Sequence, residues 1–212
     1  IENFQNEEEI ALAKSEIFSG LTGIALINHD SDHYEFLKNK AQNIGIAKES
    51  VVSFGITTFS DYQLLSTEIK NAYLSEVKVK TKNDVEISFE VSSSHKAIVF
   101  NYITVLACLD LIGKNLDKGI ATFKNPLTSK GRGEIIETEF DDKKVTIIDD
   151  SYNASLLSMK FGLEHAVSLK NALNKNRLVV ALGDMLELGD KTSQIHEQII
   201  DYLQSLKVDF AI

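Results

Sequence analysis

Two adjacent carboxylates, Asp149 and Asp150, follow an apolar, strand-like run in the string IIDDSYNAS (147–155). Residues at the carboxyl ends of strands in α/β sheets face bound ligands, and carboxylates at that position can hold sugar hydroxyls. A structural role is the alternative, because the side chain of Ser151 or Asn153 could cap the helix that follows. The pattern leaves both readings open.

A second group of acidic side chains follows another apolar run, in the string RLVVALGDMLELGDK (177–191). The order of strand, glycine, loop and helix is typical of a ligand-binding edge in an α/β sheet. The loop carries Asp184, Glu187 and Asp190, and its first basic residue is Lys191. A phosphate-binding loop built of carboxylates is not expected, so the ligand of this loop would be something other than an anion.

Lys14 is the first basic residue that could do chemistry. On a helix it would share one face with Ile10, Ile17 and Phe18, and so would stand in the middle of an apolar stripe. Its stem could pack there while its ammonium reaches water. Alternatively, the lysine is held there for a purpose, because a buried lysine is costly and readily loses its charge.

An arginine and an amide are the other candidates. Arg132 stands between glycines in KGRG (130–133), where it could reach a phosphate with both guanidinium edges or be a solvated charge in a linker. Asn101 lies within the apolar run IVFNYITVLACL, and a buried amide needs partners. The amide of Asn101 would bond either to a ligand or to a neighbouring backbone carbonyl.

Several common sites are absent from these 212 residues. The sequence contains no G-x-x-x-x-G-K-[ST] phosphate loop, no G-x-G-x-x-G string and no His–Cys set with zinc spacing. The net charge of −9 argues against a nucleic-acid partner or an anionic membrane surface, because both need a positive field. The apolar runs are also too short for a membrane span.

One cysteine, Cys108, excludes an intrachain disulfide, which fits a reducing cytoplasm. The chain begins at Ile1 rather than at a methionine and stops in the strand-like run VDFAI. We therefore expect it to be part of a longer protein.

The elements that must position these residues follow from hydrophobic periodicity. In the first part we expect helices at 7–18, 33–43, 97–112 and 116–123, strands at 23–28 and 51–56, and a hairpin that turns at Asn83-Asp84. The only proline, Pro126, opens a polar stretch, and a domain boundary is expected at about 126–130. This divides the chain into domains of 1–127 and 128–212.

In the second part of the chain we expect a hairpin that turns at Asp141-Asp142. Helices at 155–174 and 190–206 and strands at 177–182 and 208–212 should follow it. Alternation of strand and helix is typical of a parallel α/β domain.

Taken together, these strings resemble the Mur ligase family. The most specific are DDSYNASLLSMK (149–160) and LGDMLELGDKTSQIHEQI (182–199), which resemble the branch that adds D-alanyl-D-alanine. Three further strings agree in order along the chain, and they are LINHD (26–30), FNYITVLACLDLIG (100–113) and KGRG. The segment 1–18 resembles the stretch that follows the family's metal-binding histidine.

The resemblance implies an α/β fold: the C-terminal half of a P-loop-type ATPase domain, followed by an incomplete Rossmann-like domain. It also implies an ATP- and Mg²⁺-dependent ligase of peptidoglycan precursor synthesis, working in the cytoplasm. Such an enzyme joins D-alanyl-D-alanine to UDP-N-acetylmuramoyl-tripeptide through an acyl phosphate. The phosphate loop would lie before Ile1, so this segment alone is expected to be inactive.

The resemblance also assigns roles to residues. Lys14 matches a lysine that family members carry as a carbamate, which would make it a metal ligand. Arg132 would contact ATP phosphates, Asp150 the ribose and Asn101 the adenine. Further nucleotide-side positions are Tyr152, Asn153, Asn28 and Asp30.

The acidic loop would lie in the domain that presents the incoming dipeptide, with Asp184, Glu187 and His196 as substrate-binding residues. Asp184 or Glu187 could orient the ammonium of the dipeptide. Alternatively, Asp184 caps the loop, Met185 and Leu188 pack inward and Glu187 is solvated.

The sequence departs from the family at the adenine helix. His95 lies six residues before Asn101, whereas the family places its histidine four residues before, and Ala97 takes the aligned position. The role of His95 is therefore left open.

Two other functions are the alternatives to this interpretation. The first is another amino-acid-adding ligase of the Mur or folylpolyglutamate type, against which the Met-Leu-Glu-Leu string argues. The second is a non-catalytic binding module, which would explain the missing phosphate loop without a longer chain.

Overall fold

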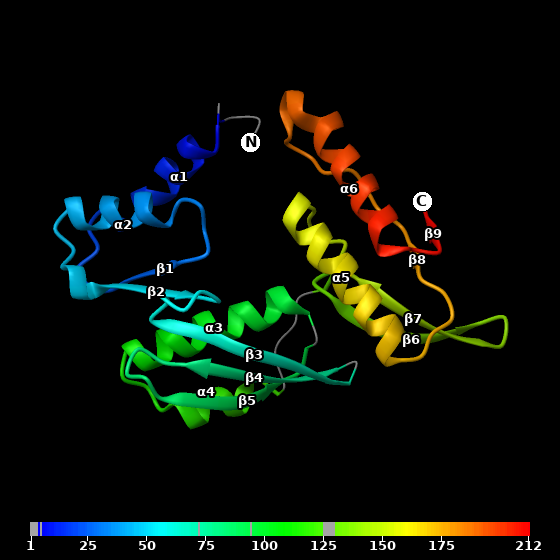
Figure 1. Cartoon of the computed structure of the whole chain (residues 1–212), viewed down its shortest axis with the longest axis horizontal. Coiled ribbons are helices and arrows are strands. Elements are labelled where there is room, and N and C mark those ends of the chain that lie inside the picture. The colour runs from blue at the N-terminus through cyan, green and yellow to red at the C-terminus, as the bar shows by residue number, and fades with distance from the viewer. Residues whose placement is uncertain (1–3, 5, 72, 94, 125–129) are drawn as a thin grey trace.

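The computed structural model describes residues 4, 6–71, 73–93, 95–124 and 130–212, and Figure 1 shows them as two groups of elements. The first group is built on a five-stranded sheet of order β1-β2-β3-β4-β5. Its strands are β1 (Ala25–Asn28), β2 (Val51–Gly55), β3 (Tyr62–Asn71), β4 (Leu74–Lys80) and β5 (Glu86–Val91). Its helices are α1 (Glu7–Ser15), α2 (Tyr34–Asn43), α3 (Lys96–Leu111) and α4 (Leu116–Thr122).

The sheet is mixed. β1, β2 and β3 run parallel, whereas β3, β4 and β5 form an antiparallel meander. The predicted hairpin turn is confirmed between β4 and β5, where Asp84 adopts a left-handed backbone with φ 58°. The parallel part places the ends of β1 and β2 at one edge, which is where α/β proteins gather polar side chains.

Helix α3 supplies one side of the main core. Val99, Ile103 and Leu106 are almost completely buried and pack with Val52 and Val77 of the sheet. The apolar run predicted as a buried helix is thus confirmed as α3. Cys108 lies on it but is exposed.

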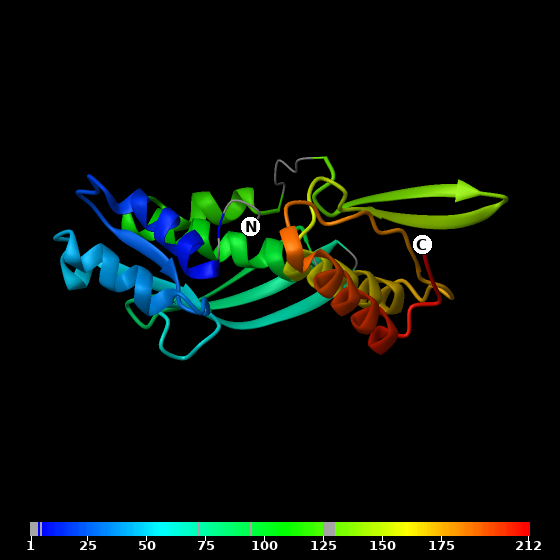
Figure 2. The same ribbon diagram turned by 90° about the horizontal axis from the view of Figure 1, so that it is seen from above.

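The second group contains β6 (Glu134–Phe140), β7 (Lys143–Asp149), α5 (Leu156–Ala172), β8 (Val179–Val180), α6 (Thr192–Leu206) and β9 (Phe210–Ala211). The β6–β7 hairpin turns at Asp141 and Asp142, with φ of 48° and 58°, as the sequence predicted. Figures 1 and 2 both show this hairpin projecting beyond the remaining elements, with α5 and α6 side by side.

Two expectations for this group are corrected. Within the described residues β7 pairs with β6 and β8 pairs with β9, so the strands form two small sheets rather than one parallel sheet. The parallel pair joins only Val179–Phe210 and Val180–Ala211, and Phe210 is 59% exposed.

The cap of α5 is also different from the two residues expected. Ser155 caps the helix, and its side chain and that of Ser158 form a reciprocal capping box. Ser151 instead donates its hydroxyl to Asp149 at 2.6 Å, and the side-chain oxygen of Asn153 accepts the N–H of Ala154 at 2.8 Å. Both side chains are engaged with the loop before the helix begins.

The predicted domain boundary overlaps residues 125–129, which lie outside the described residues, and it stays a prediction. None of the helices in the described ranges has both the length and the hydropathy that crossing a membrane requires.

Candidate functional site

Arg132 and the ring of Tyr152 lie in contact near the start of the second group of elements. The guanidinium of Arg132 stacks over the ring of Tyr152, 4.2 Å from its centroid. The N–H of Tyr152 donates to the carbonyl oxygen of Gly131 at 3.1 Å. A Cβ on Gly131 would stand 3.0 Å from that nitrogen, and its φ is +71°, so the contact requires glycine. A guanidinium over an aromatic face makes a cation–π contact and can still donate N–H groups to a ligand.

The two carboxylates at the end of β7 have different surroundings. Asp149 accepts both the hydroxyl and the N–H of Ser151, and these bonds lower its pKa. Burial raises the pKa of Asp150, whereas the charges of His95 and Arg132 and the N–H of Gly133 act to lower it. Asp149 is thus tied into its own loop, and Asp150 is the carboxylate that lies beside Arg132.

Two histidines are buried beside Asp150. His95 precedes α3 and His165 lies on α5, so the pair joins the two groups of elements. Their rings meet edge to face with centroids 5.0 Å apart, and Nε2 of His95 is 4.0 Å from Oδ2 of Asp150. Burial lowers the pKa of both, that of His165 to about 4.

Sequence reasoning left His95 without a role and did not consider His165. The available signal for His165 was its helical spacing. It falls four residues before Leu169, on the same side of the helix, and both side chains are buried on α5.

The other nucleotide-side candidates are exposed. Asn101 lies on the exposed side of α3, which contradicts the expectation of a buried amide. The helix turns about 100° per residue, so Asn101 projects roughly 120° away from His95 around the axis. Tyr152 is 65% exposed, and Asn153 is exposed as well. Asn101 thus shares a helix with this cluster without facing it directly.

Asn28 and Asp30 brace the edge where β1 and β2 end. The side-chain oxygen of Asn28 accepts the N–H of Asp30 at 2.9 Å. The carboxylate of Asp30 accepts the N–H groups of Ile56 and Thr57 at 2.8 and 3.3 Å. A Cβ on Gly55 would stand only 2.8 Å from Oδ2 of Asp30. The structure therefore gives both side chains a role in shaping the edge, and their predicted contact with nucleotide stays a prediction.

Lys14 does not lie in an apolar stripe. Its side chain is exposed and Ile17 is 78% exposed, whereas Ala11 and Phe18 are buried. The reason is that α1 packs on α2 through the side that carries Ala11, and a 3₁₀ turn at Glu16–Phe18 redirects the chain. The expected position in the middle of an apolar stripe is wrong, and carbamate formation stays a prediction.

No group of three His, Cys, Asp or Glu side chains among the described residues is placed to hold a metal ion.

The acidic loop borders a pocket of about 640 Å³, lined by residues 184–189 together with Thr192, Ser193 and His196. His196 organises this loop. Its Nε2 accepts the N–H of the buried Met185 at 3.1 Å, and its Nδ1 lies 2.8 Å from the carbonyl oxygen of Thr192. A carbonyl can only accept, so Nδ1 carries the proton and the ring is neutral in this arrangement.

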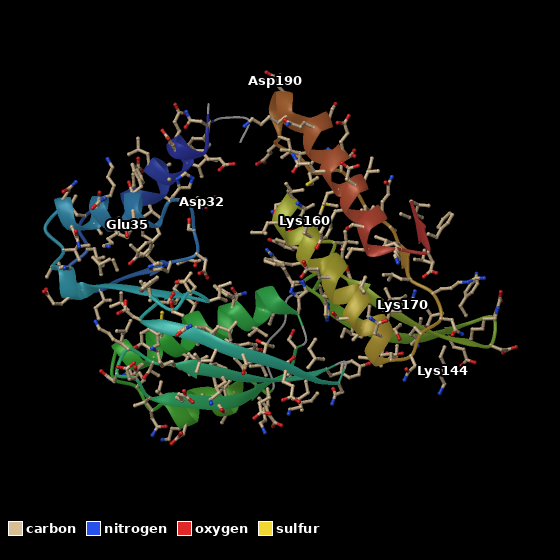
Figure 3. The ribbon with its side chains drawn as sticks, in the orientation of Figure 1. Asp32, Glu35, Lys144, Lys160, Lys170 and Asp190 are labelled. Atoms are coloured by element: carbon tan, nitrogen blue, oxygen red, sulfur yellow. The ribbon has the colours of Figure 1, made fainter. Side chains whose placement is uncertain are left out.

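Asp184 lies 3.8 Å from Nε2 of His196, with a side chain that is 90% exposed. Because Nε2 already accepts from Met185, we do not regard this approach as an ion pair. Met185 packs inward, Leu188 is half-buried and Glu187 is exposed with φ 61°. Asp190 lies at the far end of the loop, where α6 begins (Figure 3).

Comparisons with known proteins match both parts of the chain. The family model of the Mur ligase middle domain matches residues 1–109, and that of the Mur ligase glutamate ligase domain matches residues 131–212. The UDP-N-acetylmuramoyl-tripeptide–D-alanyl-D-alanine ligase of Rickettsia prowazekii is 30% identical over 210 residues, covering 96% of this chain and 43% of the relative. The enzyme of that name from Bacillus subtilis is 29% identical over 212 residues, covering 99% and 42%.

Solved structures show the same fold. A crystal structure of MurF from Acinetobacter baumannii superposes with a TM-score of 0.81 at 22% identity, covering 98% of this chain and 42% of that one. Folylpolyglutamate synthetase from Lactobacillus casei gives 0.60 at 9% identity, covering 92% and 45%. The chain spans less than half the length of these relatives. Because the middle-domain model alone matches more than half of the chain, the protein belongs to the Mur ligase family.

Proposed function

We propose that this chain forms the nucleotide side and the amine side of an ATP-dependent ligase. The ligase adds D-alanyl-D-alanine to UDP-N-acetylmuramoyl-tripeptide in the cytoplasm. The observation that carries the proposal is the cluster of Arg132, Tyr152 and Asp150 at the junction of the two groups of elements. Two curated relatives that are named for this reaction align over nearly the whole chain.

The reaction has two steps in this proposal. The tripeptide carboxylate attacks the γ-phosphorus of ATP, which forms an acyl phosphate and releases ADP. The neutral amine of the dipeptide then attacks the acyl carbon, the tetrahedral intermediate expels phosphate, and the amine loses a proton. Positioning and stabilisation of charge provide most of the catalysis in phosphoryl transfer.

Arg132 and Asp150 take the polar groups of the nucleotide. The guanidinium of Arg132, which lies over the ring of Tyr152, would donate N–H groups to phosphate oxygens. The carboxylate of Asp150, whose side chain is 37% exposed, would accept a ribose hydroxyl. The exposed amide of Asn101 is accessible to adenine, with Tyr152 and Asn153 on the adjoining loop.

Lys14 would act after reaction of its amine with carbon dioxide, as a carbamate that provides one oxygen ligand to Mg²⁺. Its exposure on α1 permits that reaction. In the complete ligase, a Lys14→Ala variant should lose activity, and short carboxylic acids should restore part of it. Unchanged activity without any effect of added acid would contradict the role of Lys14.

The acidic loop would receive the dipeptide. Its free amine is cationic before reaction, and the exposed carboxylates of Asp184 and Glu187 at the pocket rim can attract it. His196 keeps the loop in place through Met185. An Asp184→Asn variant should therefore raise the KM for D-alanyl-D-alanine with little change in the KM for ATP. An unchanged KM for the dipeptide would leave Asp184 a structural role.

The decisive experiment joins this segment to a phosphate-binding loop in a complete ligase and measures phosphate release with UDP-N-acetylmuramoyl-tripeptide and ATP. We expect release to depend on D-alanyl-D-alanine, with a product of matching mass, and not on L-alanine or glutamate. The 212-residue chain alone should show no turnover. Release that depends on a single amino acid would favour another ligase of the family, and binding without turnover would favour a binding module.

A further inference from the structure

Asp150 lies in a confined space that several elements form together. Oδ2 lies 4.0 Å from Nε2 of His95, and a Cβ on Gly162 of α5 would stand 3.2 Å from the same oxygen. The N–H of Gly133 bonds to the carboxylate, and Arg132 lies close enough to act on its charge. One face of the carboxylate is therefore closed by α5 and another by His95, while 37% of the side chain stays exposed.

We propose that His95 is a positioning residue for Asp150, which it holds in the orientation that meets the ribose, and that His165 holds the ring of His95. This inference rests on the proposed contact between Asp150 and the ribose. It concerns a residue that the family's motif places elsewhere, because the aligned position here is Ala97.

The surroundings of His95 favour one orientation of its ring. The ring is buried, meets His165 edge to face, and lies next to Gly133, where a Cβ would be 3.9 Å from Cδ2 of His95. The backbone N–H of His95 donates to the hydroxyl of Ser93 at 3.0 Å, which fixes the start of α3. The ring thus lies between His165 and Gly133, with Nε2 on the side of Asp150.

A neutral imidazole suits this task. When Nε2 carries the proton, its N–H points toward a carboxylate oxygen at 4.0 Å, and a small movement of Asp150 would complete the bond. A hydrogen bond to a charged acceptor contributes more than one between neutral groups. A cation at the same place would instead compete with Arg132 for the carboxylate. The packing of α3 against α5, through His95 and His165, therefore sets the orientation of the Asp150 carboxylate.

The test compares ATP with its 2′-deoxy and 3′-deoxy analogues in the complete ligase. The ratio of kcat/KM for ATP to that for each analogue measures recognition of the ribose hydroxyls. A role limited to packing would lower kcat/KM for all three nucleotides together and would leave the ratio unchanged. A positioning role lowers the ratio itself.

Four variants distinguish a positioning role of His95 from a role limited to packing. Asp150→Asn should lower the ratio for at least one analogue about tenfold, which is the effect of losing one hydrogen bond to a charged group. His95→Phe keeps a planar ring against His165 but has no donor, and it should lower the same ratio by a similar factor. His95→Gln keeps a donor near the position of Nε2 and should stay within about threefold of the wild type. His95→Asn is too short to reach Asp150 and should behave as His95→Phe does, so it decides the matter if the phenylalanine variant does not fold.

His33→Gln is the matched control. Nε2 of His33 lies 3.9 Å from a carboxylate oxygen of Glu7, nearly the distance in the His95–Asp150 pair, but away from the cluster. It should leave the ratio unchanged. If Asp150→Asn lowers the ratio and neither His95→Phe nor His95→Asn does, the positioning role is wrong while the ribose contact stands. If Asp150→Asn leaves the ratio unchanged, the ribose contact fails and the role of His95 fails with it.

Discussion

Gly55 allows the edge formed by β1 and β2 to close around Asp30. A Cβ at this position would stand 2.7 Å from Oγ of Ser60 and 2.8 Å from Oδ2 of Asp30. These contacts are closer than van der Waals radii allow. The backbone of Gly55 lies within β2 and needs no left-handed conformation, so a Gly55→Ala substitution tests the steric contact alone.

The expected loss in the free energy of unfolding follows from the contacts that the methyl group of the introduced alanine would displace. The carboxylate of Asp30 accepts the N–H groups of Ile56 and Thr57, and a bond to a charged group contributes about 1.5–3 kcal/mol. Asp30 is exposed, so the lower end of that range applies. Overpacking adds about 1–3 kcal/mol, and loss of glycine's freedom in the unfolded chain offsets about 0.4–1 kcal/mol. We expect Gly55→Ala to lower the free energy of unfolding by about 2–4 kcal/mol.

Thermal unfolding followed by circular dichroism measures this effect. For a chain of this length we expect Tm to fall by about 4–16 °C. Gly23→Ala is the control, because a Cβ on Gly23 meets nothing within 4 Å and its backbone is not left-handed. That substitution should leave Tm unchanged or raise it slightly.

A double-mutant cycle with Asp30→Ala identifies the partner. If the methyl group acts by displacing Asp30, Gly55→Ala should cost at least about 1 kcal/mol less once Asp30 is absent. The reasoning is refuted if Gly55→Ala is as stable as Gly23→Ala, or if its cost is the same with and without Asp30.

Three further predictions concern stability. Ser155→Ala should destabilise the chain by about 1 kcal/mol, because it removes the cap of α5, whereas Asn153→Ala should change Tm little; equal effects would contradict the assigned cap. Burial lowers the pKa of His165 from about 6.5 in the unfolded chain to about 4 in the folded chain. The unfolded chain therefore takes up the proton first, and the free energy of unfolding is highest above pH 6.5 and declines as the pH falls toward 4. Between pH 7 and pH 5 this amounts to about 2 kcal/mol in urea unfolding, and a His165→Phe variant that loses stability just as steeply would show that the burial of His165 is not the cause. Asp142→Gly should raise the free energy of unfolding by about 0.5–1 kcal/mol, because glycine adopts φ 58° without steric cost; a lower Tm would mean that the aspartate side chain stabilises the turn.

Arg132 and Tyr152 could be chosen as candidates from the sequence, because both lie in strings that resemble one family. Their contact with each other could not, because they are 20 positions apart and only the tertiary structure brings them together. The turns at Asp84, Asp141 and Asp142 were predictable, because a turn depends on neighbouring residues and sets φ above zero itself.

Burial was not predictable from periodicity alone. Lys14 and Asn101 lie in apolar stretches, yet both are exposed, because a helix has more than one side and only packing decides which side is covered. Ser155 rather than Ser151 or Asn153 caps α5, since the two earlier side chains are already engaged in the preceding loop.

The sequence by itself determined the family, the order of helices and strands, and the residues that carry charge, because these depend on types and spacings along the chain. Only the tertiary structure decided that His95 and His165, 70 positions apart in sequence, meet beside Asp150. It also decided that Asp30 reaches Ile56 and Thr57 across the end of a strand. Contacts of this kind depend on how elements pack, and no local pattern in the sequence records which side of a helix or which strand end will face which partner.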